Sequence, residues 1–395
     1  MRADRSFRRA LAALPLLLGL VGSATACSVF TLDCKKLDGG VVSARTMDFM
    51  RHAEVGWRID VMPPGVQYPA REPCPGCAAP SFTTRLPFAG LTGIGGDIWV
   101  DGLNSQGLTA AYLWLETHPF ELNYRQARHS SAPGAPMAWL DVMPYMLGHF
   151  STVKEAVAWA TSDEVQIPLH MALSDATGAS VLLEFTGSRK AEVHWGAAVV
   201  TNDPPYPEHQ RWMGVWTDAI ERAKAQGGSV DPLPPPPDTY ARVPGNWDSL
   251  PRDIRTRMLL EVACDEYPDR EWSPKPGGIL PSTAAAMSIL RSVEVPWGAN
   301  GDPPPGSFSA GDTMISMLRE HATGLYLWRS PGSPRWQGVR LRGADWSAYG
   351  GARRAIELSV GAEAWFADLT SPSGGGEQAL SGGLKLGQSD AAAAA

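Results

Sequence analysis

Long apolar runs are scarce in this 395-residue chain, so we predict no stable membrane span. The one such run, residues 10–22, is too short to cross a bilayer. The sequence also lacks an internal repeat and a glycine-rich loop of the kind that cradles phosphates. Its formal charge of −7 argues against nucleic acid as a partner. What is present is globular composition, 44% hydrophobic and 19% charged, with enough length for a large core.

Cysteine is scarce as well, with five in the chain. No two pairs have the spacing of a zinc site, and we predict no metal and no cofactor. The Pro-Gly turn between Cys74 and Cys77 favours a small disulfide loop, because disulfides persist in an exported chain. Setting Cys27 aside, an even number remains, and three pairings are open among Cys34, Cys74, Cys77 and Cys264.

The first 26 residues have the pattern of a secretory signal peptide. Arginines precede an apolar stretch, which is followed by Ala24-Thr25-Ala26, a small-residue cleavage site. We therefore expect an exported protein, periplasmic or secreted, whose mature chain begins at Cys27. The Arg8-Arg9 pair leaves twin-arginine export open beside the general secretory route.

A cysteine directly after the cleavage site has a second interpretation, a lipoprotein in which Cys27 carries the lipid. Lipoprotein signals usually place Leu three residues before the cysteine, and Ala24 stands there in this chain. Lipidation with N-acylation would consume the α-amine. A lipidated, non-catalytic binding protein and an enzyme that uses the amine are therefore mutually exclusive hypotheses.

The hydrophobic pattern predicts one α+β domain over residues 27–370. Strands are expected at 27–34 and 41–49 with a turn at 37–40, in a hairpin over 97–115, within 170–201, and at 314–319 and 324–328. Helices are expected at 137–150, 153–161, 210–226, 254–264 and 284–293. Residues 63–87 and 231–238 are expected to be loops, and 371–395 a disordered tail rich in Gly, Ser and Ala.

A cysteine with a free α-amine supplies a nucleophile and its base in one residue. The thiolate attacks, while the amine, with a reference pKa of about 7.7–8.0, accepts a proton and later returns it. A nearby cation would favour the thiolate, and Arg45 on the returning strand is the candidate. Asp48 on the same strand is the candidate carboxylate for holding the amine. Outside a motif, these two residues would be interpreted as a surface ion pair.

Three segments, Cys27-Ser28, Gly39-Gly40 and 45–49 (RTMDF), resemble the start of the choloylglycine hydrolase family, which includes bile salt hydrolases and penicillin V acylases. Two further stretches, 101–108 (DGLNSQGL) and 201–206 (TNDPPY), match the family in the same order. The resemblance covers roughly residues 27–335. It implies a four-layer αββα sandwich of the N-terminal-nucleophile hydrolase type and a homotetramer.

The resemblance implies an active site built around Cys27 as the nucleophile, with Arg45 and Asp48 beside it. Asn202 would donate a side-chain N–H to the oxyanion, together with the backbone N–H of Trp114. Without the motif, Asn202 before Asp-Pro-Pro would be interpreted as a turn residue.

A further family arginine should follow a Leu-Pro-Gly-Asp-like stretch, and residues 250–257 (LPRDIRTR) depart from that pattern. We predict Arg257 for this role, with Arg255 as the rival. Asn104, in the other matching stretch, is expected to be a turn residue rather than a catalyst.

Trp114 bears on the substrate, because the resemblance implies Asn there in bile salt hydrolases and Tyr in Gram-positive penicillin V acylases. Trp114 resembles the Gram-negative branch, whose members hydrolyse penicillin V or N-acyl homoserine lactones. Tyr112 and Trp114 are expected on one strand face as aromatic walls for an apolar acyl group. We predict an amidohydrolase of these small substrates; a conjugated bile salt hydrolase is the alternative. Acid ceramidase-like relatives cleave an internal bond to expose their cysteine, whereas Cys27 follows the signal directly.

Overall fold

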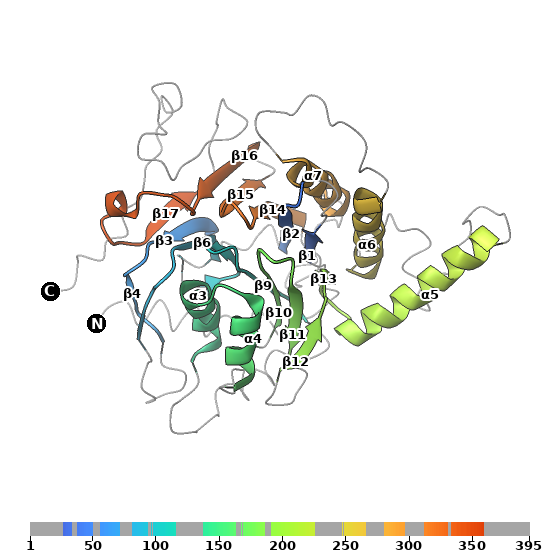
Figure 1. Cartoon of the computed structure of the whole chain (residues 1–395), viewed down its shortest axis with the longest axis horizontal. Helices are drawn as coiled ribbons and strands as arrows, with labels where there is room; N and C mark the ends of the chain where they lie inside the picture. Colours follow the sequence, from blue (N-terminus) through green and yellow to red (C-terminus); the bar gives the residue numbers. More distant parts are fainter. Residues whose placement is uncertain are drawn as a thin grey trace, which may run out of the picture.

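The computed structural model describes residues 27–33, 38–49, 56–71, 81–93, 96, 98–115, 137–162, 167, 169–185, 191–225, 247, 249–265, 280–296, 312–330 and 333–358. Two antiparallel sheets face each other, with helices on their outer sides (Figure 1). This arrangement confirms the predicted α+β, four-layer αββα sandwich. Among the described helices, none combines the length and the apolar character needed to cross a membrane.

The first sheet has six strands, and the second strand in its order is β1, the first strand of the chain. Its order is β13 (Val199–Thr201), β1 (Ser28–Asp33), β2 (Val41–Phe49), β14 (Asp312–Glu320), β15 (Leu325–Ser330) and β16 (Ser333–Arg340). The outer side of this sheet is covered by α6 (Ser249–Asp265) and α7 (Pro281–Val293).

The second sheet has nine strands. Its order is β12 (Glu192–Trp195), β11 (Ser180–Glu184), β10 (His170–Ser174), β9 (Thr109–Leu113), β8 (Asp101–Asn104), β6 (Phe88–Gly93), β3 (Arg58–Met62) and β17 (Arg354–Glu357), with β7 (Ile98–Trp99) paired to β6. Its outer side is covered by α3 (Trp139–His149) and α4 (Val153–Ser162). The remaining elements are the ribbon β4 (Gln67–Tyr68) and β5 (Phe82–Thr83), the 3₁₀ helix η2 (Trp346–Tyr349), and α5 (Tyr206–Ala225).

Strand β2 shows why the chain folds into layers. Its first eight residues are buried, and their side chains alternate between the two sides of the sheet. Val42 and Ala44 pack toward α7, while Met47 packs in the core between the sheets. An αββα sandwich requires both kinds of core: one between a sheet and its helices, and one between the two sheets.

The turn before β2 is built as the Asp-Gly pair predicts. Gly39 has a φ of 71°, a conformation that favours glycine, and the Gly40 N–H donates to Asp38 Oδ1 at 2.8 Å. The other carboxylate oxygen, Oδ2, accepts from the Ser282 backbone N–H at 2.9 Å. One aspartate thus closes the turn and satisfies a free N–H in the first turn of α7.

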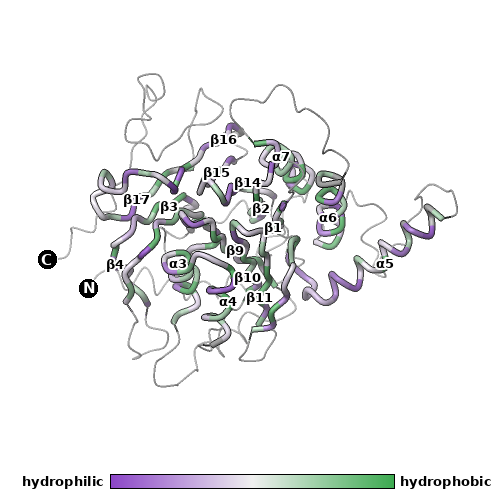
Figure 2. Tube along the Cα trace, viewed as in Figure 1, coloured by the Kyte–Doolittle hydropathy of each residue, from purple (hydrophilic) through white to green (hydrophobic). Residues whose placement is uncertain are grey.

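Helix α5 extends away from the sandwich, and its exposed length is largely hydrophilic (Figure 2). Three predicted helix starts were too late: α5, α6 and α7 begin at residues 206, 249 and 281 rather than 210, 254 and 284. In each, a proline (Pro207, Pro251 or Pro281) lies in the first turn, where its missing N–H breaks no helical bond. The helix starts predicted from the sequence all lie after these prolines.

Two other expectations need correction. Residues 63–87 are not only loop, because β4 and β5 pair within them. The late strand pair is part of a longer meander in which β16 follows β15. The signal peptide, the 231–238 loop, the 371–395 tail and the pairing of Cys34, Cys74, Cys77 and Cys264 lie outside what the structure describes.

Candidate active site

Cys27 lies at the head of β1, between β2 and the end of β13. Ser28 pairs with Thr46 of β2 and with Thr201 of β13. Because both pairings are antiparallel, Cys27 lies beside Met47 and Asn202, one residue further along each partner strand. It is a free cysteine, 6% exposed, in the core between the sheets. Its Sγ is 3.7 Å from Met47 Sδ. Strand register therefore brings together two segments that are 175 residues apart in the chain, counting from the numbering of Cys27 and Asn202.

Arg45 provides the predicted cation beside this thiol. Its Nη2 lies 3.6 Å from Cys27 Sγ and donates to the Tyr112 carbonyl at 2.6 Å. Its Nη1 donates to the Val100 carbonyl and lies 3.5 Å from Asp101 Oδ2. Burial alone lowers the pKa of Arg45, but the charges of Cys27 and Asp101 raise it, and the net pKa is raised. A permanent cation is thus fixed beside the sulfur, where it favours a thiolate.

Asp48 lies on the helix-facing side of β2 and is held by three donors. Its Oδ2 accepts from Arg252 Nη1 at 2.6 Å and from Thr46 Oγ1 at 3.3 Å, and its Oδ1 accepts from Thr313 Oγ1 at 2.5 Å. Burial raises the pKa of Asp48, and the three donors oppose the rise without cancelling it. Thr46 Oγ1 also accepts from the Ser28 N–H at 3.1 Å, which links the carboxylate to the head of β1.

Arg252 makes the contact with this carboxylate, and the assignment of Arg257 as the family arginine stays a prediction. Arg257 instead donates from Nε to Asp253 Oδ2 at 2.9 Å, and the rival Arg255 lies over the Trp247 ring at 5.5 Å. A helix turns by about 100° per residue, so positions 252 and 257 point about 140° apart. Arg257 therefore cannot share the direction of Arg252. The late predicted start of α6 had left Arg252 outside the helix.

Asn202 follows β13 directly and is 2% exposed. Its backbone carbonyl accepts from His209 Nε2 at 3.0 Å. Its side-chain Oδ1 has no hydrogen-bond partner among the described residues. A buried amide at the register position opposite the nucleophile suits a ligand contact, but its unpaired oxygen can only accept, so the role of its nitrogen as oxyanion donor stays a prediction.

Tyr112 does not line the space beside Cys27. Its hydroxyl donates to the Trp139 carbonyl at 2.9 Å, and its ring packs against Trp139 in the core under α3. The prediction of Tyr112 as a substrate wall is thereby corrected: its backbone carbonyl, which accepts from Arg45, is what reaches the site. Trp114 lies one residue beyond β9 and is partly buried. Its contribution to substrate binding and to the oxyanion stays a prediction.

Asn104 is the turn residue that we expected. Its Oδ1 accepts from the backbone N–H groups of Gln106 and Leu108, both at 3.0 Å. Its Nδ2 donates to the carbonyls of Leu147 and Phe150. The side chain is therefore fully occupied in closing the β8–β9 hairpin and fixing it to α3.

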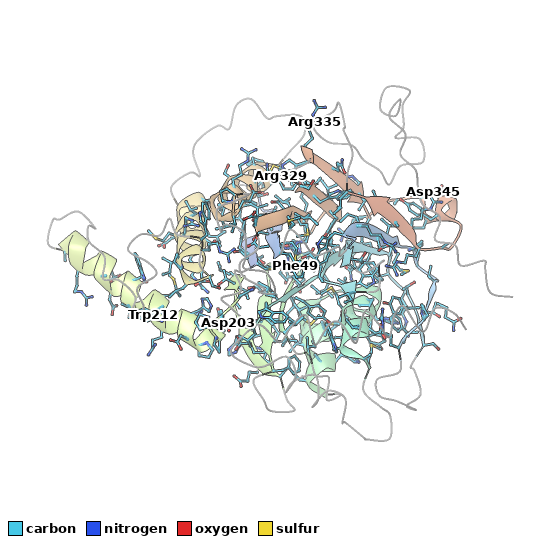
Figure 3. The ribbon with its side chains drawn as sticks, turned by 180° about the vertical axis from the view of Figure 1, so that it is seen from behind. Phe49, Asp203, Trp212, Arg329, Arg335 and Asp345 are labelled. Atoms are coloured by element: carbon cyan, nitrogen blue, oxygen red, sulfur yellow. The ribbon has the colours of Figure 1, made fainter. Side chains whose placement is uncertain are left out.

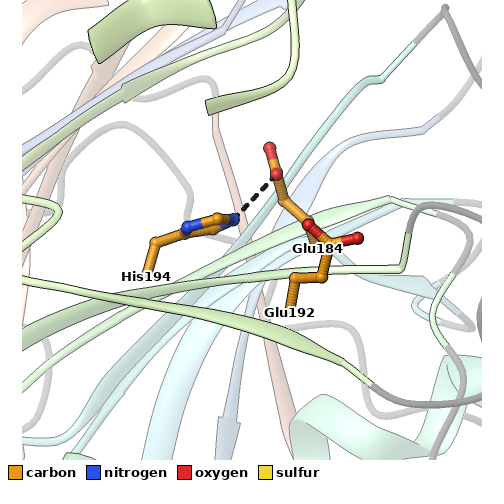
Figure 4. A group of neighbouring side chains, drawn as sticks. All are labelled: Glu184, Glu192 and His194. Carbon is orange, nitrogen blue, oxygen red and sulfur yellow. Dashed lines mark hydrogen bonds and ion pairs between the residues drawn. The ribbon is translucent and has the colours of Figure 1, made fainter. Parts of the chain in front are cut away.

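One group of described residues has the composition of a metal site: Glu184, Glu192 and His194 hold ligand atoms within 4.8 Å of one another (Figure 4). The Glu184 carboxylate already accepts from His194 Nε2 at 3.0 Å and from the Tyr206 N–H at 2.8 Å. Burial raises the pKa of Glu184, but these bonds and the nearby His170 lower it overall. We assign this group a structural role, because the carboxylate anchors the first residue of α5.

The described site can perform nucleophilic displacement at a carbonyl. A buried thiol lies beside a fixed cation and opposite a buried amide, and an ion pair on the other side of β2 holds the strand end. The base would be the α-amine of Cys27, which exists only after the bond to Ala26 is cut.

A four-layer sandwich with a buried cysteine at the head of β1 is the arrangement that the sequence resemblance implied, and the comparison with protein families agrees. Residues 27–299, more than half of the chain, match the family described as linear amide C–N hydrolases, choloylglycine hydrolase family. The chain belongs to the choloylglycine hydrolase family, which places it among the linear amide C–N hydrolases.

Individual relatives are more distant. A penicillin V acylase of Pectobacterium atrosepticum is 24% identical over 285 residues, which cover 65% of this chain and 66% of that relative. The structure of penicillin V acylase from Agrobacterium tumefaciens matches with a TM-score of 0.62 at 24% identity, over 85% of this chain and 92% of the other. A variant of the conjugated bile acid hydrolase from Clostridium perfringens matches with a TM-score of 0.61 at 18% identity, over 84% and 97%. These likenesses in structure show a shared fold.

Besides Arg252, Asp101 and Thr313 belong to the site and were not predicted from the sequence, and they differ in how they could have been found. Asp101 begins the 101–108 motif, and its carboxylate joins Arg45, Arg319 and Tyr326 in the core between the sheets. The motif itself was a signal for it. Thr313 bonds Asp48 from 265 residues away, and nothing local in the sequence marks it.

Proposed function

We propose that this protein is an exported amidase that uses Cys27 as an N-terminal nucleophile. Removal of residues 1–26 would free the α-amine of Cys27, which then accepts the thiol proton. The observation that carries the proposal is the placement of Arg45 Nη2 3.6 Å from Cys27 Sγ, both buried. The fold does not need the thiol in order to hold this cation in place. The cation nevertheless lowers the free-energy cost of forming a thiolate.

The reaction proceeds through an acyl-thioester. Cys27 Sγ forms a bond to the amide carbon, and the oxygen gains negative charge that the Asn202 side chain and the Trp114 backbone N–H stabilise. The C–N bond then breaks, and the leaving amine takes the proton from the α-ammonium group. Water, deprotonated by the same amine, attacks the thioester and releases the acid and the thiol.

Apolar surroundings support a substrate with an apolar acyl group. The core that contains Cys27 is flanked by partly buried apolar side chains, among them Phe49 and Trp57, whose rings meet edge to face at 5.4 Å. Figure 3 shows Phe49 near the middle of the molecule, where the sheets meet. Penicillin V, with its phenoxyacetyl group, and N-acyl homoserine lactones carry apolar acyl groups of the kind that such side chains bind. The relatives named as penicillin V acylases support the first of these.

A hydrolysis panel tests the substrate class. Purified mature protein is incubated with penicillin V, a long-chain N-acyl homoserine lactone and glycocholate, and release of the free amine is measured. We expect kcat/KM for one of the first two to exceed that for glycocholate. A preference for glycocholate would make the alternative, conjugated bile salt hydrolysis, the function. No turnover of any substrate, with a lipid on Cys27, would support the binding lipoprotein instead.

A further inference from the structure

The segment that carries Asn202 is fixed to its surroundings at three points. Thr201 Oγ1 donates to the Ser249 carbonyl at 3.2 Å at the start of α6. The Asn202 carbonyl accepts from His209 Nε2 at 3.0 Å, and the Tyr206 N–H donates to Glu184 at 2.8 Å. Two anchors come from α6 and the second sheet, and the middle one comes from the first turn of α5. Figure 3 shows Asp203 of this segment beside the base of α5.

His209 is the anchor that touches Asn202 itself. It is 2% exposed, so its imidazole has no access to bulk water. Its Nε2 bonds the Asn202 carbonyl, and its Nδ1 lies 3.6 Å from Asp253 Oδ2, an ion-pair distance. A carboxylate facing one ring nitrogen favours a proton on that nitrogen, and simultaneous donation from Nε2 to the Asn202 carbonyl requires the protonated imidazolium. The ring is thereby held in one orientation between α6 and Asn202.

Arg257 completes the arrangement. It donates from Nε to Asp253 Oδ2 at 2.9 Å and from Nη2 to the Val199 carbonyl of β13 at 3.1 Å. Its guanidinium also lies over the Tyr206 ring at 5.8 Å. Arg257 therefore joins the carboxylate that orients His209 to the strand that leads into Asn202.

We propose that His209, oriented by Asp253 and Arg257, is a positioning residue that sets the Asn202 amide for the developing oxyanion. The inference rests on the oxyanion role of Asn202 in the proposed function. An oxyanion donor acts only when it lies about 2.7–3.1 Å from the position that the oxygen reaches in the transition state. Moving the peptide of Asn202 by a fraction of an ångström moves that donor as well.

The charges around His209 favour its protonated form, which can donate from both nitrogens. Asp253 and Arg257 face it from α6, the Asn202 carbonyl faces it from the segment after β13, and His170 interacts with it from β10. Burial alone lowers the pKa of His209, but Asp253 and the Asn202 carbonyl raise it, and the net pKa is raised. His170, in contrast, has its pKa lowered to about 4 by burial, so it adds no positive charge near pH 7.

The test compares His209→Met, which has no donor, with His209→Gln, whose amide nitrogen can reach the place of Nε2. Both are made in the wild type and in Asn202→Ala, with whichever panel substrate is hydrolysed fastest. His149→Gln is the matched control, because that histidine bonds the Tyr145 carbonyl within α3 and touches no part of the site.

We expect His209→Met to lower kcat about 10- to 100-fold with less than about a threefold change in KM, since an ångström of misplacement can cost about 100-fold. His209→Gln should recover most of that loss. In the Asn202→Ala background the same change should lower kcat by less than about twofold, because residues acting through one group are not additive. A selectively labelled Asn202 side-chain amide signal should shift in His209→Met and stay in place in His149→Gln, with or without turnover.

Other results overturn the inference. Equal losses in both backgrounds, or a Gln variant as impaired as the Met variant, would give His209 a merely structural role, as would an unmoved Asn202 signal. If Asn202→Ala keeps full kcat, the oxyanion role in the proposed function fails. If Asn202→Ala is impaired but His209→Met is not, only the positioning role fails.

Discussion

Replacing Arg252 with Met removes the cation of a fully buried ion pair. The Arg252 and Asp48 side chains are both 0% exposed, and their atoms Nη1 and Oδ2 are 2.6 Å apart. Removing one partner of such a pair typically costs about 3–5 kcal/mol, because the other charge is left buried without compensation. We expect the free energy of unfolding of Arg252→Met to fall by that amount at pH 7.

Protonation of Asp48 gives an independent estimate of the same cost. A carboxyl that must be neutral in the fold, and has a reference pKa of about 3.9 when unfolded, costs about 1.36 kcal/mol for each pH unit above that value. The cost is at most about 4 kcal/mol at pH 7 and about 1.5 kcal/mol at pH 5, because the wild type already carries part of it. The folded pKa of Asp48, already raised in the wild type, is raised further in the variant, because Arg252 no longer lowers it. The variant therefore keeps its stability at low pH and loses more of it than the wild type as pH rises through the folded pKa. The deficit should therefore shrink on acidification.

The assay is urea unfolding of the variant and the wild type at pH 5 and pH 7, with the slope of the transition checked for constancy. Arg255→Met is the matched control from the same helix. It removes a cation from above the Trp247 ring, which should lower the free energy of unfolding by about 0.5–1 kcal/mol at either pH. Adding Asp48→Asn to Arg252→Met should recover part of the loss, because it removes the uncompensated charge.

The same substitution should affect catalysis if Asp48 must be ionised. The acidic limb of the kcat/KM profile should move to higher pH in Arg252→Met, since the Asp48 pKa rises when the cation is gone. A deficit that is independent of pH, or no larger than that of Arg255→Met, would refute the pairing as the source of the effect.

Three further substitutions test the proposed chemistry. Cys27→Ala should abolish amide hydrolysis with the circular dichroism spectrum unchanged, and Cys27→Ser should keep at most a trace, because a hydroxyl ionises far less readily than a thiol; full activity in the Ala variant would end the nucleophile hypothesis. Asn202→Ala should lower kcat about 100- to 1,000-fold with a modest change in KM, and a mainly KM effect would make it a substrate-positioning residue. Trp114→Ala should weaken hydrolysis of penicillin V more than that of glycocholate, at about 25 cal/mol for each Å² of apolar surface that the substrate no longer buries; equal losses would refute its role as an apolar wall.

Much of the site near the chain head could be predicted from sequence because one hairpin builds it. Cys27 and Arg45 lie at neighbouring positions on paired strands, and the antiparallel register of β1 and β2 brings them together. Alternation along β2 also separates Arg45, toward the second sheet, from Asp48, toward the helices. Local rules were sufficient there.

The contacts to Asp48 could not be predicted in the same way, because they depend on packing between distant elements. Arg252 and Thr313 reach it from 204 and 265 residues away. To find Arg252 rather than the arginines at 255 and 257, one must know where α6 begins and which side of the helix packs on the sheet. Pro251 obscured the start of the helix.

Tyr112 failed for a third reason. Strand alternation showed which residues share a face, but it could not show which face of β9 meets the helices and which meets the first sheet. The Tyr112 side chain packs under α3, whereas the alternate residues Ala111 and Leu113 lie in the core with Cys27. To assign each face of β9 to the helices or to the first sheet, the arrangement of both sheets must be known.

The most direct test of the account is the mass of the N-terminal peptide from the exported protein, quenched in acid during turnover of penicillin V. We expect a peptide that begins at Cys27, has an unmodified α-amine, and carries the phenoxyacetyl group on sulfur in a fraction of molecules. The adduct should be absent in Cys27→Ala. A mature chain that begins elsewhere, a lipidated Cys27, or an acyl group on a different residue would contradict it.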